Sequence, residues 1–337
     1  MEPKPNAVSQ NPDISIIICT RNHASALEPT LQSLAQAKVP AGRSCELVVV
    51  DNGSSDNTAQ IVENAKIPNI EVRLVREERP GLSNARNCGL AASRGAVILF
   101  TDDDIRPPSD WIERMSAPIL SGKFQAVAGG VRLAPHLESE EMEPMHRQWL
   151  ASTQYLKPEE LDRMVGANMA FGREVLERVA AFDAELGAGA LGFGEESLFS
   201  RQILEAGFKL EIALDVCVEH HFDASRLARV HLIDAAQRRG RVSAYTKHHW
   251  EHTQINHPHY GLARAVLRLM WWRFLRRKQL QKATIAPVWE LSMIWEISLY
   301  RAWLTERRRP RKYQKRGLGK LDSPASDSSP DGSPDGA

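Results

Sequence analysis

Short apolar runs alternate with helical patterns along the first two thirds of the chain, and this alternation constrains the fold more than any other feature. Runs typical of buried strands cover residues 14–19, 46–50, 70–75 and 96–100, and helical patterns cover about 25–37 and 82–93. Repeated strand–helix units with nearly continuous apolar strands are typical of a parallel sheet that helices cover on both faces. We therefore predict an α/β fold with a Rossmann-like, mostly parallel sheet.

Three consecutive carboxylates follow the fourth apolar run. Asp102, Asp103 and Asp104 come directly after the run at 96–100 and Thr101. Open α/β sheets bind ligands at the carboxyl ends of their strands, and clustered carboxylates repel one another unless a cation neutralises them. Hard oxygen ligands suit Mg²⁺ or Mn²⁺, which would in turn hold a diphosphate. The alternative is a solvated acidic turn that caps a helix starting near Ser109.

The charge balance and the cysteines limit the class of protein. With 43 basic and 42 acidic residues the net charge is +1, so no overall field favours binding to nucleic acid. The four cysteines lack CxxC spacing and are expected to be reduced thiols of a cytoplasmic protein. The N-terminus lacks the apolar core of a signal peptide, and no stretch is apolar and long enough for a membrane span.

The C-terminal third is markedly basic. Apolar residues, including Trp271 and Trp272, are interleaved with arginines over residues 260–281, and a second basic cluster covers 307–316. This pattern favours a helix that lies in the plane of an anionic membrane surface, with the protein peripheral on the inner face of the cell membrane. The alternative is a helix packed on the α/β domain, where the stems of the arginines cover apolar surface.

These patterns divide the chain into four parts. We expect a disordered N-terminus over residues 1–13, an α/β domain over 14–222, and a helical, basic and amphipathic extension over 223–320. The last stretch, 321–337, consists mainly of Ser, Pro, Asp and Gly and is predicted to be disordered because it offers almost nothing to bury.

Several motifs occur in one order within residues 14–222. They are CTRN at 19–22, ELVVVDNGSSDNT at 46–58, RPGLSNARNCGL at 79–90, FTDDD at 100–104, GANMAF at 166–171, GEE at 194–196 and VEHH at 218–221. A lone DxD motif would be weak, but the ordered set is specific. Together the motifs resemble glycosyltransferase family 2, and this resemblance implies the GT-A fold and an inverting enzyme that uses a nucleotide sugar.

The resemblance also implies a set of donor-binding residues. The nucleotide sugar would be bound by Thr20, Arg21, Asn22, Asp51, Arg79, Arg86, Asp102 and Asp103. Within this set, Asp51 would contact the base and Asp102 the ribose. Arg79 or Arg86 would add a cationic contact to the nucleotide, bidentate if it reaches phosphate.

The metal ligands and the base follow from the same resemblance. Asp104 would bind the divalent ion, Mn²⁺ or Mg²⁺, with Asp102 and His220 as further ligands, and the ion would act as a Lewis acid on the departing diphosphate. The acceptor hydroxyl must lose its proton to a nearby carboxylate. That role falls on Glu196. Because the family usually has Asp at this position, Glu195 remains the alternative base.

We therefore expect sugar transfer from a nucleoside diphosphate sugar to a hydroxyl of a saccharide or lipid-linked acceptor, in polysaccharide or glycolipid synthesis. One alternative is a sugar-phosphate nucleotidyltransferase, although the stretch after the first strand offers no glycine for a phosphate loop. The other is a non-catalytic nucleotide-sugar-binding or scaffold protein, which would be expected to lack the DxD motif or the acidic pair.

Overall fold

The structure is a computed structural model that describes residues 11–321. The stretches 1–10 and 322–337 of the two termini predicted to be disordered lie outside the described residues. Just inside the described part, the Asp13 carboxylate accepts hydrogen bonds from Arg43 Nη1 at 2.8 Å and from the Ser44 amide at 2.9 Å.

A single eight-stranded sheet forms the centre of the α/β part, in the order β3-β2-β1-β4-β7-β6-β8-β5. Its strands are β1 (Ile14–Thr20), β2 (Cys45–Asp51), β3 (Ile70–Arg76), β4 (Val97–Thr101), β5 (Ile105–Arg106), β6 (Ala126–Leu133), β7 (Asn168–Gly172) and β8 (Leu210–His220). Strands β1 to β4 are parallel, as predicted. Strand β7 runs antiparallel to both β4 and β6, so the second half of the sheet is mixed.

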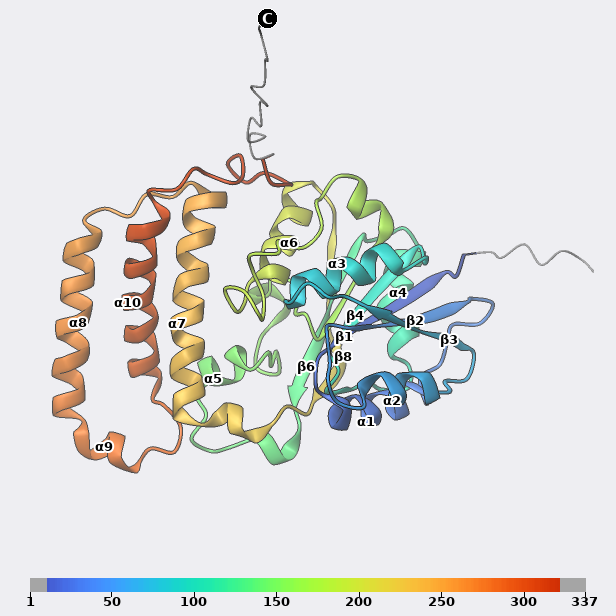
Figure 1. Cartoon of the computed structure of the whole chain (residues 1–337), viewed down its shortest axis with the longest axis horizontal. Helices are drawn as coiled ribbons and strands as arrows, with labels where there is room; N and C mark the ends of the chain where they lie inside the picture. The colour runs from blue at the N-terminus through green and yellow to red at the C-terminus, as the bar shows by residue number, and fades with distance from the viewer. Residues whose placement is uncertain (1–10, 322–337) are drawn as a thin grey trace, which may run out of the picture.

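Helices cover both faces of the sheet, which confirms the predicted layering (Figure 1). The helices of this part are α1 (Ala24–Leu34), α2 (Thr58–Asn64), α3 (Leu82–Ala92), α4 (Trp111–Leu120), α5 (Pro144–Trp149) and α6 (Glu195–Glu205). Short 3₁₀ helices cover Pro135–Leu137, Pro158–Glu160, Arg173–Glu177 and Ala224–Leu227. Because side chains alternate along a strand, Ile16 packs with α1 and α4 on one face, whereas Ile17 packs with α3 on the other.

Three long helices stand beside the α/β part (Figure 1). The C-terminal elements are α7 (Arg229–Thr246), a π-helical turn at Lys247–Glu251, α8 (Pro258–Leu275), α9 (Arg277–Lys282) and α10 (Val288–Glu306). Helix α10 lies between α7 and α8. The α7–α10 contact is close because Gly240 has no side chain: a Cβ there would lie 2.5 Å from the Trp295 carbonyl oxygen.

Buried ion pairs link the helices of this layer. The side chain of Glu290 on α10 is fully buried and accepts hydrogen bonds from Arg229 on α7 and Arg273 on α8. A second pair joins Arg268 on α8 to Glu296 on α10. Within residues 11–321, no helix combines the length and the apolar character that crossing a bilayer requires.

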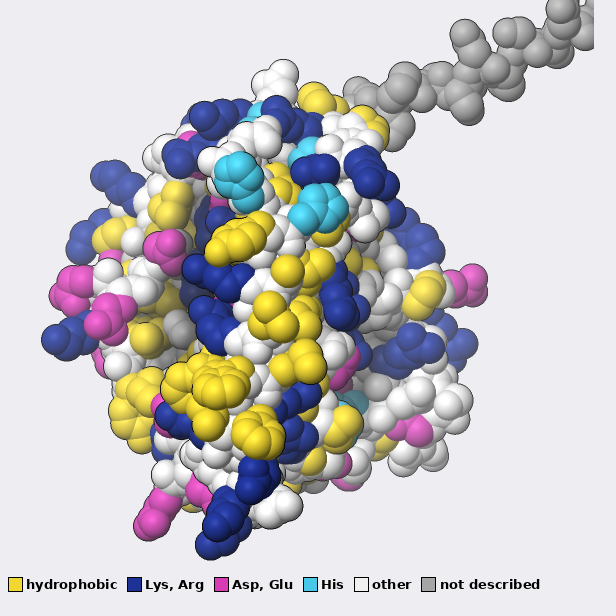
Figure 2. All heavy atoms as spheres, turned by 90° about the vertical axis from the view of Figure 1, so that its left-hand side faces the viewer, with side chains coloured by type: hydrophobic (Ala, Val, Ile, Leu, Met, Phe, Trp, Pro, Cys, Tyr) yellow, Lys and Arg dark blue, Asp and Glu magenta, His cyan; other side chains and the backbone are white. Residues whose placement is uncertain are grey.

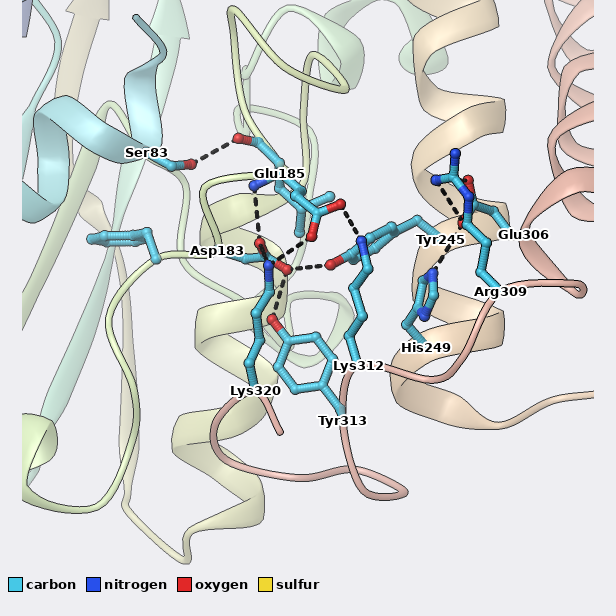
Figure 3. A network of polar contacts seen from close by, with 12 residues as sticks. Ser83, Asp183, Glu185, Tyr245, His249, Glu306, Arg309, Lys312, Tyr313 and Lys320 are labelled. Carbon is cyan, nitrogen blue, oxygen red and sulfur yellow. Dashed lines mark hydrogen bonds and ion pairs between the residues drawn. The ribbon is translucent and has the colours of Figure 1, made fainter. Parts of the chain in front are cut away.

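The segment after α10 crosses back to the α/β part and ends beside the loop that precedes α6 (Figure 1). Asp183 is the centre of this contact, as Figure 3 shows. Its Oδ2 accepts hydrogen bonds from the hydroxyls of Tyr245 and Tyr313, each at 2.6 Å, and its Oδ1 lies 2.5 Å from Lys320 Nζ. The C-terminal segment is thereby tied to both α7 and the α/β part.

The Asp183 network makes a pH-dependent contribution to stability. Burial by itself raises the pKa of Asp183, but the Lys320, Tyr245 and Tyr313 donors outweigh it and hold this pKa below its ordinary value. A carboxylate with a lowered pKa in the folded state contributes stability at all pH values above its unfolded pKa of about 4. That contribution is lost as the pH falls through the lower, folded value.

We predict that Tyr313→Phe lowers the free energy of unfolding by about 1 kcal/mol at pH 7, since it removes one buried hydrogen bond to a carboxylate. The difference from the unmodified protein should persist down to about pH 4 and shrink at lower pH. Urea denaturation at a series of pH values measures it. Tyr260→Phe is the control, because Tyr260 is 70% exposed. A difference of the same size for both variants would contradict the role of Asp183.

Candidate active site

The carboxyl ends of three neighbouring strands meet at one edge of the sheet. Strands β2, β1 and β4 are adjacent and parallel, so Asp51, Thr20 and the carboxylates after Thr101 lie at the same edge. This is the position at which open α/β sheets bind ligands. The strand order, rather than proximity in the sequence, brings the first, second and fourth motifs together.

Asp102, Asp104 and His220 each place one ligand atom within 4.8 Å of the others. The short strand β5 pairs with the end of β8, which sets Ile105 opposite His220 and brings the imidazole to the acidic turn. His220 Nε2 lies 3.2 Å from Asp104 Oδ1. Burial raises the pKa of Asp104, but the contact with His220 outweighs it and lowers that pKa overall.

These three residues fit a divalent cation. Asp104 Oδ1 is buried and has no aligned hydrogen-bond donor among the described residues, so its lone pairs are available. Two carboxylates and one imidazole are ligands that suit Mn²⁺ and also allow Mg²⁺. The structure thus brings together the three side chains that were predicted as metal ligands.

Asp103, together with His23 and Asp104, forms a second group whose ligand atoms lie within 4.8 Å of one another. The Asp103 Oδ1 lies 2.8 Å from Nδ1 of His23, and this hydrogen bond raises the pKa of His23 against the opposing effect of burial. Sequence reasoning did not select His23, although it follows directly after the CTRN motif.

Arg86 joins the acidic turn to the acidic pair on α6. The guanidinium is 3% exposed, its Nη1 lies 2.6 Å from Glu195 Oε1, and its Nη2 lies 3.8 Å from Asp102 Oδ1. Gly166 leaves room for this geometry, because a Cβ at that position would come within 2.3 Å of Arg86 Nη2. Burial raises the pKa of Asp102, and the charge of Arg86 opposes that rise.

A glycine-rich loop precedes α6, and the acidic pair Glu195 and Glu196 forms the start of that helix. Gly187, Gly189, Gly192 and Gly194 all adopt positive φ, a conformation that residues with a Cβ rarely adopt. The loop is held from α3, since the Ser83 hydroxyl donates to the Leu186 carbonyl oxygen at 2.8 Å (Figure 3). Carboxylates in the first turn of a helix also interact favourably with its dipole.

The two carboxylates of the pair have different surroundings. Glu195 is 4% exposed and engaged by Arg86. Burial, followed by the neighbouring Glu196 charge, raises the pKa of Glu195, and Arg86 opposes this. Glu196 is only partly buried and lines a cavity between the α/β part and the C-terminal helices. It forms no ion pair with any residue in 11–321. Glu196 is therefore the carboxylate of the pair that is free to meet a ligand.

The cavity has a volume of about 1100 Å³ and lies between the α/β part and the C-terminal helices. Its walls include the acidic turn and Glu196 on one side and residues of α7, α8 and α10 on the other, among them Arg239, Arg268 and Trp295. The extension is thus part of the cavity wall. A pocket of this size holds a nucleotide sugar or a ligand of similar dimensions.

Five predicted donor-binding residues lie outside the lining of this cavity: Thr20, Arg21, Asn22, Asp51 and Arg79. Asn22 accepts a hydrogen bond from the Ser55 amide, and Asp51 accepts one from the Ser54 amide, so both order the turn after β2. The side chain of Arg79 is 70% exposed and paired with Glu77. Their contacts with a nucleotide remain predictions.

Several residues of the cavity wall escaped sequence reasoning. The most notable are basic and aromatic side chains that come from distant parts of the chain: Trp149, Arg163, Phe193, Arg226 and Arg239. The basic character of residues 223–320 was a signal, but it gave no means of selecting the arginines that face inward.

Comparison with known proteins gives a consistent assignment. Residues 15–180 match the family model described as glycosyl transferase family 2. Glycosyltransferase AglE of Haloferax volcanii is 34% identical over 122 residues, covering 36% of this chain and 40% of AglE. Succinoglycan biosynthesis protein ExoO of Rhizobium meliloti is 36% identical over 114 residues, covering 33% of this chain and 31% of ExoO. The matches thus span less than half the length of these curated relatives.

The fold is also that of a solved enzyme. The mannosyltransferase PcManGT from Pyrobaculum calidifontis, solved in complex with GDP-Man and Mn²⁺, superposes with a TM-score of 0.60 at 20% sequence identity. The superposition covers 88% of each chain, which is more than the α/β part alone. At this identity the likeness establishes the fold, and the predicted GT-A fold is confirmed.

We predict that Arg86→Met lowers the free energy of unfolding by about 3–5 kcal/mol, because it leaves buried carboxylates without their cation. In Arg86→Met/Glu195→Gln the loss should be smaller than the sum of the two single losses, by about 0.5–3 kcal/mol. Urea denaturation of the unmodified protein, the two single variants and the double variant provides the test. Arg241→Met, at an exposed position, should change stability by about 0.5 kcal/mol at most. Strict additivity would show that Arg86 and Glu195 do not interact.

Proposed function

The chain belongs to glycosyl transferase family 2 through residues 15–180, and on this premise we propose that it transfers a sugar from a nucleoside diphosphate sugar to an acceptor hydroxyl. One observation carries the proposal. A group that could hold a cation, Asp102, Asp104 and His220, faces the same cavity as Glu196, a carboxylate without an ion pair among the described residues. The cavity is large enough for both substrates.

The acidic cluster accounts for the donor side. Asp102, Asp104 and His220 would hold Mn²⁺ or Mg²⁺, which supplies Lewis-acid stabilisation of the departing diphosphate. The buried Asp104 Oδ1, which has no aligned hydrogen-bond donor among the described residues, supports this role, as does the Mn²⁺ named with the solved mannosyltransferase of the same fold. Asp51 would contact the nucleotide base, as the family resemblance implies.

Glu196 accounts for the acceptor side. Its carboxylate would accept the proton of the acceptor hydroxyl while the oxygen bonds to the anomeric carbon and the bond from that carbon to the diphosphate breaks. A single displacement of this kind inverts the anomeric centre. Glu195 is the weaker alternative, because its ion pair with Arg86 would have to break before it could accept a proton. Arg86 instead orients the pair.

The acceptor we propose is a saccharide or a lipid-linked saccharide, in polysaccharide or glycolipid synthesis. The named role of ExoO in succinoglycan biosynthesis supports the polysaccharide class. The surface of α8 supports an acceptor that resides at a membrane.

Helix α8 has an unusual outer face (Figure 2). A band of exposed apolar side chains runs along it: Tyr260, Leu267, Met270, Trp271, Phe274 and Leu275, each between 56% and 70% exposed. Arginines and lysines flank the band, and Arg264, Arg276, Arg277 and Lys278 form no ion pair with a described residue. An amphipathic face with a basic rim is typical of helices that lie on anionic bilayers, so we propose that α8 seats the protein peripherally on the inner, anionic face of the cell membrane.

The transfer activity predicts metal-dependent nucleotide binding. One of UDP, GDP, TDP or CDP with Mn²⁺ should raise the melting temperature by about 4 °C at a hundredfold excess over its Kd. The shift should vanish in EDTA and in Asp104→Asn. Glu196→Gln should keep the shift. In the presence of a panel of acceptors, this variant should release nucleoside diphosphate from the matching sugar nucleotide at least about 10²-fold more slowly than the unmodified protein.

The matched control is Glu205→Gln, at the far end of α6, which should keep both nucleotide binding and turnover. If no nucleotide shifts the melting temperature of folded protein, the donor site is wrong and a non-catalytic role gains support. If the protein instead releases pyrophosphate from a nucleoside triphosphate and a sugar phosphate, it is a nucleotidyltransferase.

The membrane proposal has its own test. We predict that the protein sediments with vesicles containing phosphatidylglycerol, and that replacing both Trp271 and Phe274 by Ser weakens this binding by about tenfold or more. Raising the salt concentration should also weaken it. The control variant, Tyr155→Ser/Val230→Ser, removes exposed apolar side chains away from α8 and should bind normally. Equal binding to neutral phosphatidylcholine vesicles would refute the electrostatic part.

A further inference from the structure

One side chain on the helical wall of the cavity carries charge without a carboxylate partner. The Arg239 guanidinium of α7 lies 4.2 Å from the centre of the Phe193 ring and 5.2 Å from that of Trp149. It donates one hydrogen bond, from Nη2 to the Trp149 carbonyl oxygen at 2.9 Å, while its buried Nε has no hydrogen-bond partner within residues 11–321. Aromatic faces and a carbonyl hold this cation in place, but it forms no ion pair with a carboxylate of the described residues.

Two further arginines line the same cavity near Arg239. Arg226 packs over the ring of Phe222 at 4.8 Å and has no ion-pair partner among the described residues. Arg163 has a single ion pair in the described part, at 3.5 Å to the adjacent and largely exposed Asp162. We refer to Arg163, Arg226 and Arg239 as the arginine cluster.

Arg239 lies within Coulombic range of the two other members of the arginine cluster. Burial lowers the pKa of Arg239 to about 10; the Glu196 carboxylate opposes this effect, and the charges of Arg163 and Arg226 add to it. Arg239 is thereby also within Coulombic range of the proposed base, Glu196.

Other cations of the cavity wall are neutralised by carboxylates: Arg86 by Glu195, Arg201 by Glu251 at 3.0 Å and Arg268 by Glu296. Buried guanidinium groups are normally paired, since an uncompensated charge in a partly desolvated site is unfavourable. Arg239 departs from this pattern, since its buried Nε has no partner within residues 11–321. Arg226, at an exposed position, also forms no ion pair with a described residue. The contrast within one cavity indicates that Arg239, with Arg226 and Arg163 beside it on the wall, is complementary to an anion that enters from outside the chain.

The chemistry of the cluster identifies the class of anion. Guanidinium groups present parallel N–H donors that match phosphate oxygens. A phosphate monoester or a diphosphate carries about two negative charges near neutral pH, and therefore matches three convergent cations better than a single carboxylate does.

We propose that the arginine cluster binds a phosphate or diphosphate group of the acceptor and thereby presents the acceptor hydroxyl to Glu196. This inference rests on the proposed function, which supplies the acceptor. The diphosphate of the donor is the other source of the same chemistry, because Arg226 also lies within Coulombic range of Asp104 and His23. Arg239, by contrast, interacts with Glu196 and Glu195, on the side of the base.

The probe for the cluster is inorganic pyrophosphate, titrated by calorimetry into the full chain in EDTA, so that no metal ion contributes. The unmodified protein should bind it, and Arg239→Gln should weaken binding by about tenfold or more, the effect of losing a charged hydrogen-bond donor. Arg241→Gln makes the same charge change at an exposed position of α7 and should leave the affinity within about twofold. If Arg239→Gln does not fold, Arg226→Gln, at an exposed position, takes its place with the same expectation.

A second measurement distinguishes a phosphate group of the acceptor from the diphosphate of the donor as the ligand of the arginine cluster. The Kd of the nucleoside diphosphate with Mn²⁺ is measured for the same variants. If the cluster serves the acceptor, this Kd stays within about twofold in Arg239→Gln while pyrophosphate binding falls. A tenfold loss of nucleotide affinity, or pyrophosphate binding unaffected by Arg239→Gln, overturns the proposal. Metal-dependent nucleotide binding without pyrophosphate binding would refute the arginine cluster and leave the proposed function standing.

Discussion

The buried ion pair between Arg86 and Glu195 is the interaction on which the site depends. It joins the third motif, on α3, to the acidic pair on α6, and it brings the same cation within 3.8 Å of the Asp102 carboxylate. One guanidinium therefore holds the acidic turn after β4 and the first turn of α6 in a fixed relation. It engages Glu195, whereas Glu196 forms no ion pair with any described residue, so two adjacent carboxylates have different surroundings.

The helical extension completes the site instead of standing apart from it. Helix α7 contributes Arg239 to the cavity, and α8 and α10 contribute further lining. The Asp183 network then ties the segment after α10 to the loop that precedes the acidic pair. The outer face of α8 is directed away from the cavity wall and into solvent (Figure 2). Such an arrangement would let one layer of helices meet a membrane on one side and a substrate on the other.

Most of the α/β part could be predicted from local pattern. The runs at 14–19, 46–50 and 96–100 became β1, β2 and β4 with boundaries shifted by one residue at most. Apolar continuity reports burial, and burial on both faces is what a central parallel strand experiences. The antiparallel placement of β7 between β4 and β6 was not predictable in this way, because the direction of a strand depends on long-range pairing.

The sequence by itself determined the parallel strand–helix core, the family and the acidic residues at the ends of strands, because these depend on short-range periodicity and on motifs of adjacent residues. Only the tertiary structure decided that Glu195 is paired with Arg86 whereas Glu196 forms no ion pair with a described residue, and that Arg163, Arg226 and Arg239 line one cavity. Residues separated by tens of positions become neighbours through strand order and helix packing. The pairing of a charge is a property of those neighbours, so it cannot be read from the charged residue alone.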